Sequence, residues 1–412
     1  MQYVINDHLV LSEVPEGHLA AYLSPFAQSL GRQGYAERYI HRQVMLAARF
    51  SRWLEQTEAL NHCITSEHAA RYLKLRYRRR RPNRGDRAAL SHFIAFLRGE
   101  EVIPPEEVLT PQLTPVEQCV RAYEQYLRKE RVLAQATIVN YVPFIDRFLK
   151  DHFDAGPVKL SSLRARDVVG FVQRQARQLH LKRAKLLTTA LRSFLQYARY
   201  RGEIPLDLAT AVPCVANWSM PSIPRAIAPD QVRRLLSQID RNTPVGRRDY
   251  AILLLLARLG LRSGEVAFLE LDDIDWQRGC LSVQGKRGRR TQLPLPQDVG
   301  EAIVAYLRHG RPRSSTRRVF LRARAPVRGF LSQCAVGTIV RHALLRAGIE
   351  APTTGAHQFR HALATQMLRQ GASLAQIGEL LGHQSPETTK IYTKVDLDAL
   401  RTLALPWPGG VR

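Results

Sequence analysis

The first half of the chain contains an internal repeat that restricts it to a helical fold. Five positions recur at one constant offset, as Leu90, Phe93, Phe96, Ile103 and Pro104 and again as Leu191, Phe194, Tyr197, Ile204 and Pro205. Arg49-Phe50 recurs as Arg147-Phe148 at a slightly smaller offset. The Leu-x-x-Phe-x-x-aromatic spacing places these side chains on one face of a helix, whereas a strand would alternate them. The sequence therefore predicts a duplicated all-helical module.

Two proline-rich stretches divide the chain into three segments. They run over 103–115 and 205–224, where prolines interrupt any regular element. We predict three units, at about 1–110, 111–220 and 225–412, which suit the usual size of a domain. Each copy of the repeat should begin with an amphipathic helix, continue through a second and close with the aromatic one. In the second copy the first helix carries Val120, Tyr123, Tyr126 and Leu127, and the second helix lies near 141–148.

The third segment alternates helices with one short β-hairpin. Apolar and polar residues alternate over 280–284, glycines at 285 and 288 turn the chain, and 291–295 returns. Lys286 lies at the tip of this hairpin. The predicted fold class is therefore mainly α, with a small β-hairpin in the C-terminal segment.

Capping signals mark the last helices. Ser373 with Gln376 has the pattern of a capping box, and Gly382 ends that helix. Ser385-Pro386 then starts another helix, with Ser at the N-cap and Pro at the first position. Tyr392 should lie about two turns into it.

The charge of the chain indicates a polyanionic partner. Lys and Arg total 61 against 36 Asp and Glu, which gives a formal charge of +25 and an isoelectric point near 10.5. Nucleic acid is the leading class. The most apolar run, 251–257, is too short to span a bilayer, and the N-terminus does not resemble a secretion signal. Five scattered cysteines without a C-x-x-C pair are expected to be reduced thiols, and we predict a cytoplasmic, nucleoid-associated protein.

Two basic clusters lie at similar places in the two copies of the repeat. The first holds six arginines in nine residues, and the candidate DNA-binding residues of both clusters are Arg76, Arg78, Arg79, Arg80, Arg81, Arg84, Lys182, Arg183 and Lys185. A run of charge can simply be a solvated helix face or a loop. Recurrence in both copies favours contacts with DNA phosphates.

The residues that suggest chemistry lie in the third segment, in a fixed order. They are Gly-Leu-Arg262-Ser-Gly-Glu265, Lys286 in the hairpin, His357-Gln-Phe-Arg360-His361, Leu-Gly-His383 and Tyr392. Singly each is weak, since a tyrosine in a C-terminal helix is usually a packing residue and a lone histidine is usually structural. Together, their order and spacing resemble the tyrosine recombinase (phage integrase) family, whose Arg, Lys, His-x-x-Arg, His or Trp, and Tyr recur in that sequence. All six positions are filled here.

The resemblance implies a chemistry of DNA cleavage and rejoining. The third segment corresponds to the family's catalytic domain and the second to its helical, SAM-like core-binding domain, while the first is an addition that the shortest members lack. Tyr392 would form a transient 3′-phosphotyrosine bond with the DNA. No metal ion, nucleotide or other cofactor is expected, because the chain has neither a carboxylate cluster beside these residues nor a phosphate-binding loop.

Physical chemistry supports a role for each of these residues. Fixed guanidinium groups at Arg262 and Arg360 suit a phosphate that gains charge during attack, and His383 would donate a further hydrogen bond. His357, three residues before Arg360 and so on the same helix face, could accept the proton of Tyr392, since a free tyrosine is a poor nucleophile at neutral pH. Glu265 would hold Arg262 in place.

Lys286 is the expected general acid, which protonates the departing 5′ oxygen. Three other basic residues lie close to Lys286 in the hairpin, which makes this assignment less distinctive. They are expected to contact DNA: Arg287, Arg289 and Arg290. The family's lysine is usually followed by glycine, whereas Arg287 follows it here.

Several alternatives stay open. The same chemistry could serve a type IB topoisomerase-like enzyme, and an architectural DNA-binding protein could keep the residues without the activity. A recombinase could serve a mobile element, in integration, excision or transposition, or the resolution of chromosome dimers, and the extra N-terminal module favours the element. Partners would be double-stranded DNA, three further copies in a synaptic tetramer, and companion recombinases. The apolar tail is the expected contact between copies: Leu397, Leu400, Leu403, Leu405 and Trp407.

Overall fold

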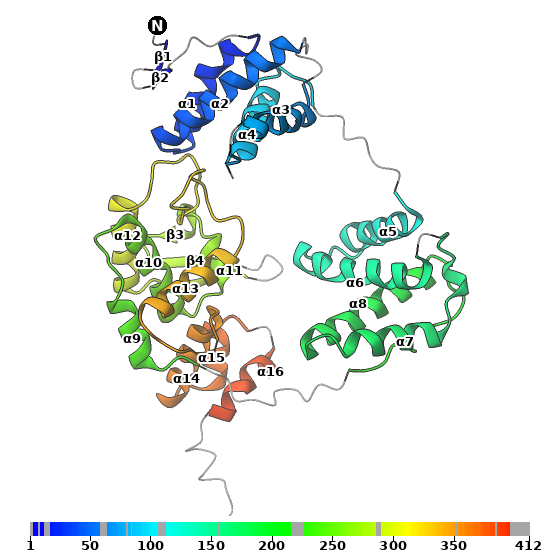
Figure 1. The fold of residues 1–412 in the computed structure, drawn as a ribbon. Coiled ribbons are helices and arrows are strands. Elements are labelled where there is room, and N and C mark those ends of the chain that lie inside the picture. Colours follow the sequence, from blue (N-terminus) through cyan, green and yellow to red (C-terminus); the bar gives the residue numbers. More distant parts are fainter. Residues whose placement is uncertain are drawn as a thin grey trace, which may run out of the picture. The chain divides into compact units, whose positions relative to one another are not determined.

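The computed structural model describes residues 3–6, 9–11, 17–57, 64–79, 81–83, 85–105, 113–154, 156–215, 226–285, 290–351, 353–383 and 385–395. These residues form a mainly helical protein with two small antiparallel sheets (Figure 1), which confirms the predicted fold class. Contacts divide the chain into two units, one made of residues 1–106 and 222–412 and the other of 107–221. The three-domain division stays a prediction.

Both copies of the repeat fold into four helices in the same order. The first copy has α1 (Leu23–Arg32), α2 (Glu37–Gln56), α3 (Ser66–Arg79) and α4 (Asp86–Gly99), after a 3₁₀ turn η1 (Ala20–Tyr22). The second has α5 (Pro115–Lys129), α6 (Gln135–Phe153), α7 (Ala165–Ala176) and α8 (Leu181–Tyr200), with η3 (Leu160–Ser162) before α7. In each copy the second helix packs against the first and the fourth, and the fourth packs against the third. The sequence pattern had predicted three of these helices and missed the third, α3 and α7.

The repeated residues occupy equivalent places in the two copies. Phe93 of α4 and Phe194 of α8 are both fully buried. After α4 the chain turns at Glu101 with a φ of 56°, and after α8 it turns at Gly202 with a φ of 75°. The next amide donates back into each helix over 2.9 Å, from Val102 to Leu97 and from Glu203 to Ala198. The two helices therefore end in the same hydrogen-bonded turn.

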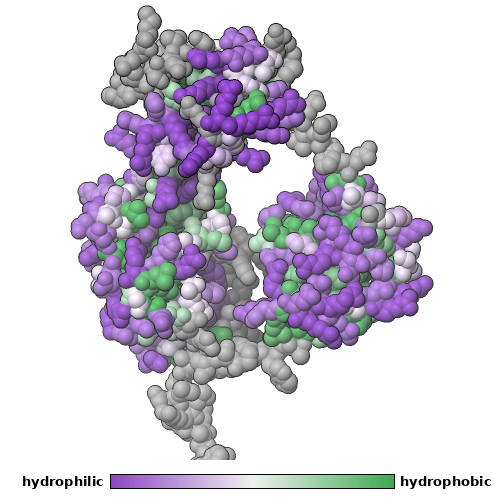
Figure 2. Space-filling model, in the orientation of Figure 1, coloured by the Kyte–Doolittle hydropathy of each residue, from purple (hydrophilic) through white to green (hydrophobic). Residues whose placement is uncertain are grey.

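Each segment of the chain encloses its own apolar core. The first two cores mix phenylalanine and tyrosine with aliphatic side chains, whereas the third is mostly aliphatic and includes a buried run on α10 (Pro244–Leu259). A small separate cluster joins Ala364, Ile377, Leu381 and Tyr392. Figure 2 shows many hydrophilic residues, with hydrophobic patches between them, on the face of α5–α8 turned to the viewer. No helix among the described residues is long and apolar enough to cross a membrane.

A short hairpin precedes the first helical copy and was not predicted. It pairs β1 (Tyr3–Asn6) with β2 (Leu9–Leu11) in antiparallel register. Strands of four and three residues are too short to display a convincing alternation, so the sequence pattern missed them.

The third segment packs several helices around α10 and also contains a three-stranded sheet. The strands are β3 (Ile274–Asp275), β4 (Cys280–Gln284) and β5 (Arg290–Pro294), with β4 in the centre. Leu281 pairs with Leu293 and Gln284 with Arg290, which confirms the predicted hairpin. The two-residue strand β3 was missed. The remaining elements are α9 (Pro229–Ser237), α11 (Ser263–Ala267), η4 (Leu271–Asp273), α12 (Gln297–His309), α13 (Cys334–Arg346), α14 (His357–Arg369), α15 (Leu374–Leu380), α16 (Pro386–Thr389) and η6 (Lys390–Val395).

The C-terminal helices follow their capping signals, with one difference. Ser373 and Gln376 form the predicted capping box of α15, and Gly382 ends this region with a φ of 59°. The helix that starts after Ser385 is α-helical only as α16, and its continuation η6 is a 3₁₀ helix. Tyr392 therefore lies on a tighter winding than the α-helix that the sequence predicted.

Candidate active site

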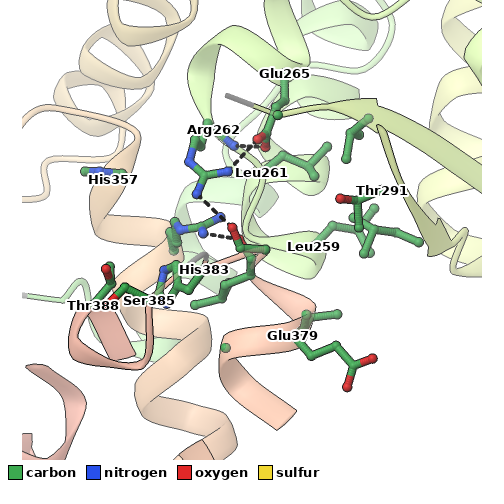
Figure 3. A pocket seen from close by; sticks show the side chains of 18 residues that line it. Leu259, Leu261, Arg262, Glu265, Thr291, His357, Glu379, His383, Ser385 and Thr388 are labelled. Atoms are coloured by element: carbon green, nitrogen blue, oxygen red, sulfur yellow. Dashed lines mark hydrogen bonds and ion pairs between the residues drawn. The ribbon is translucent and has the colours of Figure 1, made fainter. Parts of the chain in front are cut away.

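A pocket of about 560 Å³ lies where the end of α10, the β-hairpin, the start of α14 and the chain after α15 meet. Four of the six predicted catalytic residues line it: Arg262, His357, Arg360 and His383. Figure 3 shows Arg262, His357 and His383 around the same space, although they come from separate parts of the third segment. Two guanidinium groups and two imidazole rings therefore line the same pocket.

Gly260 shapes the turn that leads to Arg262. It ends α10 in the left-handed region, with a φ of 59°. A Cβ atom there would lie 2.9 Å from the side chain of Leu381 and 3.0 Å from that of Leu363. Glycine fits this position because it alone tolerates both the backbone conformation and the close approach.

Glu265 fixes the side chain of Arg262. The backbone N–H of Arg262 donates to Glu265 Oε2 over 2.7 Å, and its guanidinium Nη1 donates to Glu265 Oε1 over 2.7 Å. Nη2 also donates to the carbonyl oxygen of Gly382 over 3.4 Å. The Glu265 side chain is buried, while a third of the Arg262 side chain remains exposed to the pocket side. Arg262 thus presents a positioned positive charge (Figure 3).

Arg360 is buried within the same turn region. Its Nη1 donates to the carbonyl oxygen of Gly260 over 2.8 Å, and its Nη2 donates to the carbonyl oxygen of Leu381. Burial and the nearby Arg262 lower the pKa of Arg360 to about 10. This value is still far above neutrality, so Arg360 stays charged, and two guanidinium groups adjoin one pocket.

The two histidines of the pocket are held neutral. Desolvation, then the charges of Arg360 and Arg262, lower the pKa of His357, although this residue keeps a solvent-exposed face. The same causes in the same order lower the pKa of His383 to about 4. A neutral imidazole has one N–H donor and one acceptor, so each ring can donate a hydrogen bond without an added charge.

Tyr392 lies beside the pocket and does not line it. Its side chain is only 1% exposed and belongs to the small apolar cluster with Leu381. Its ring lies parallel to that of His383, with centroids 6.4 Å apart. Burial raises the pKa of Tyr392, and the charge of Arg360 opposes this only in part. The phenol therefore keeps its proton at neutral pH.

Two residues in contact with this set were not predicted from the sequence. His361 Nδ1 lies 3.0 Å from the Tyr392 hydroxyl, and Thr389 Oγ1 lies 2.8 Å from His383 Nδ1. His361 stands inside the His-Gln-Phe-Arg-His string, directly after Arg360, which was the available signal. Thr389 likewise stands inside the string from Leu381 to Tyr392 that resembles the family, but nothing in that string shows its contact with His383.

The predicted hairpin residues lie partly outside the described structure. Lys286, Arg287 and Arg289 are among the residues it does not describe, while Arg290 is exposed at the start of β5. The strands that carry this tip do reach the pocket, since Gly285 and Thr291 line it.

The predicted DNA-binding residues differ in their surroundings. Of those in the two helical copies, six are exposed: Arg78, Arg79, Arg81, Lys182, Arg183 and Lys185. Arg80 and Arg84 lie outside the described residues. Arg76 is instead mostly enclosed, with its Nε 3.5 Å from a carboxylate oxygen of Asp86, a buried residue that Arg42 also contacts at 3.0 Å. Arg76 therefore takes part in packing within the first helical copy.

Comparison with known proteins identifies the family. Residues 225–398 match the model of the phage integrase family, and residues 120–202 match that of the phage integrase N-terminal SAM-like domain. A putative integrase/recombinase of Sinorhizobium fredii, y4rA, is 56% identical over 409 residues, which cover 99% of both chains. The tyrosine recombinase XerD of Mycobacterium tuberculosis is 32% identical over 70% of this chain and 96% of its own.

Solved structures agree with this result at the level of the fold. The site-specific recombinase XerH, crystallised with its difH substrate after cleavage, covers 98% of both chains with a TM-score of 0.55 and 18% identity. From its sequence relatives and its catalytic segment, the chain belongs to the phage integrase family of tyrosine recombinases, enzymes that cleave and rejoin DNA strands.

Proposed function

We propose that this protein is a site-specific DNA recombinase that joins itself to DNA through Tyr392 as a 3′-phosphotyrosine. The observation that carries the proposal is the convergence of Arg262, His357, Arg360 and His383 on one pocket, with Tyr392 directly behind it. Phosphoryl transfer needs fixed positive charge around the phosphate, and this pocket offers two guanidinium groups that hydrogen bonds hold in place.

The arginines and the histidines of the pocket are proposed to bind the phosphate in different ways. Arg262 and Arg360 neutralise the charge that grows on the nonbridging oxygens as the phenol attacks. His357 and His383, both neutral, donate hydrogen bonds to the same oxygens. The two arginines supply the charge that a metal ion supplies in other nucleases, so the proposed reaction uses neither a metal ion nor a nucleotide.

Lys286 is the proposed general acid for the departing 5′ oxygen. The support comes from its neighbours, because Gly285 lines the pocket and β5 returns to it at Thr291. Lys286 directly follows the pocket-lining Gly285 in the sequence.

Both helical copies are proposed to bind the DNA. Exposed basic residues of both copies would bind phosphates, Arg78, Arg79 and Arg81 in the first and Lys182, Arg183 and Lys185 in the second. This proposal divides the chain into three domains, 1–110, 111–220 and 225–412. The match of residues 120–202 to a SAM-like integrase domain supports it for the second copy.

The biological role that we propose is movement of a mobile element by a tetramer on two DNA duplexes. The name integrase/recombinase of the 56% identical relative supports the element, and a lambda integrase tetramer solved on a Holliday junction supports the assembly. The tail from 397 to 407 lies outside the described residues, and its docking on a neighbouring copy remains a prediction. Companion recombinases and a location on the nucleoid remain proposals of the same kind.

Mapping covalent protein–DNA junctions across genomic DNA tests the proposal. The wild type should leave a small number of discrete junctions at related sequences, and Tyr392→Phe should leave none. Junctions scattered without sequence preference would instead indicate a topoisomerase-like enzyme. DNA binding without any covalent junction would indicate an architectural protein.

A further inference from the structure

His361 contacts the attacking atom of Tyr392. Its Nδ1 lies 3.0 Å from the phenolic oxygen, and the two ring centroids are 5.7 Å apart at an angle of 61°. Among the described residues, this is the one hydrogen bond that the phenol makes. In the tautomer with a proton on Nε2, His361 Nδ1 accepts the hydrogen bond from the Tyr392 hydroxyl.

His357 and His361 face different reacting groups although they share a helix. They lie one turn apart on α14, and their ring centroids are separated by 5.6 Å. His357 lines the pocket with both arginines, whereas His361 does not line it and contacts Tyr392. By position, His361 rather than His357 adjoins the nucleophile, so the proton-accepting role that the sequence suggested for His357 fits His361 better.

The surroundings of His361 keep it in its basic, neutral form. Four titratable or charged groups adjoin it: His357 and Arg360 on its own helix, His383 after α15, and Tyr392 from η6. Desolvation, then His357 and Arg360, lower the pKa of His361. Helices α9 and α10 also pack against α14, and no acid or base described on them contributes to this shift.

We propose that His361 is the general base of strand cleavage, a role that rests on the function proposed above. As the Tyr392 oxygen forms its bond to phosphorus, its proton passes to His361 Nδ1, and the bond from phosphorus to the 5′ oxygen breaks. That oxygen takes a proton from the proposed general acid, Lys286. Rejoining runs the same steps backwards, with His361 returning the proton to the phenol, so the cycle needs no further reactant.

One layer of side chains separates the phenol from the pocket. His383 lines the pocket on one side and stacks on Tyr392 on the other, and Arg360 also borders both. Attack therefore requires this layer to open when the phosphate binds. His361 is itself close to the pocket, since its ring centroid lies 5.6 Å from that of His357, which lines the pocket.

The test measures the single-turnover rate of covalent adduct formation against pH, on a nicked suicide substrate built from a mapped junction. His361→Ala should lower the rate at pH 7 by about 10²- to 10⁴-fold, the usual worth of a general base. Its rate should then rise steadily with pH and approach that of the wild type as the phenol begins to ionise. Added imidazole should restore part of the rate. His361→Asn can accept a hydrogen bond but not a proton, so it should be as slow as His361→Ala.

Controls separate this proposal from its competitors. His342→Ala, at an exposed position of α13, should leave the rate unchanged. A wild-type rate in His361→Asn would reduce His361 to a positioning residue and overturn the proposal. The proposal would also be overturned if the rate lost its pH dependence in His357→Ala but kept it in His361→Ala. Failure of the wild type itself to form an adduct would contradict the proposed function instead, which keeps the two failures distinguishable.

Discussion

The hydroxyl of Thr389 is placed to select which nitrogen of His383 carries the proton. Thr389 is buried, and its hydroxyl lies 2.8 Å from His383 Nδ1. If the hydroxyl donates to Nδ1, the remaining N–H lies on Nε2, the side that can reach the pocket. Thr389→Val keeps the shape but removes the donor. We expect about a tenfold slower adduct formation at unchanged DNA affinity, which corresponds to roughly 1.4 kcal/mol.

Thr389→Ser provides the matched control, because it keeps the hydroxyl and loses only a methyl group. It should restore most of the rate. Equal rates for Thr389→Val and the wild type would show that the ring needs no such support.

The lowered pKa of His383 predicts a loss of stability in mild acid. In the unfolded chain this histidine titrates near its ordinary value of about 6.5, whereas in the fold its pKa is about 4. Between these values the unfolded state binds more protons, so the free energy of unfolding falls as the pH falls from 6.5 towards 4. Thermal unfolding between pH 7.5 and 4.5 should show a midpoint that drops by several degrees. His383→Asn should show a shallower drop, and an identical drop would contradict the assignment.

The sequence identified the individual groups of the site better than their contacts. The order of Arg262, Lys286, His357, Arg360, His383 and Tyr392 was readable because each stands in a short, recognisable string. The string also contained His361, yet nothing in it shows that this ring meets the phenol while His357 meets the pocket. That difference depends on how α14 and η6 pack, which is a tertiary property.

Gly260 supports the site through the turn after α10. Its carbonyl oxygen accepts a hydrogen bond from Arg360, and its backbone adopts a conformation that a side chain disfavours. Gly260→Ala should lower the free energy of unfolding by roughly 1–3 kcal/mol through strain and through the contacts with Leu363 and Leu381. It should also slow adduct formation, since Arg360 would shift.

Gly337→Ala is the control for this substitution. Gly337 lies inside α13, where an added Cβ meets nothing within 4 Å. Alanine there should leave stability unchanged or raise it by about 0.5–1 kcal/mol. Chemical denaturation of both variants compares them directly, and equal effects would contradict the role of the Gly260 turn.

Long, patterned elements were predictable, whereas short ones were not. The repeated aromatic helices α4 and α8, the β4–β5 hairpin and the capping box of α15 all carry several residues in a fixed pattern. Strands β1, β2 and β3 contain too few residues for such a pattern. The change from α16 to η6 has no signal in the sequence, because both windings accept the same residues.

The whole molecule should bind DNA chiefly by neutralising phosphates. On duplex DNA, log affinity should fall by about 0.9 per phosphate contact for each log unit of salt. Changing the exposed Arg78, Arg79 and Arg81 together to Ala should reduce the slope of log affinity against log salt by the equivalent of up to about three phosphate contacts. Arg76→Ala should instead lower stability and leave the slope unchanged, because Arg76 adjoins buried Asp86. Binding titrations across a salt series measure the slope for both variants. An unchanged slope for the triple variant would show that these three arginines do not contact DNA phosphates.

Formation of a covalent bond between Tyr392 and DNA is the most direct test of the proposed recombinase. The assay uses a duplex nicked beside a mapped cleavage point, with EDTA present, no ATP added, and the adduct resolved on a denaturing gel. The wild type should form the adduct under these conditions. Tyr392→Phe should keep its fold and DNA affinity and form none, because it lacks only the attacking oxygen. An adduct formed by Tyr392→Phe, or a wild type that requires Mg²⁺, would contradict the mechanism.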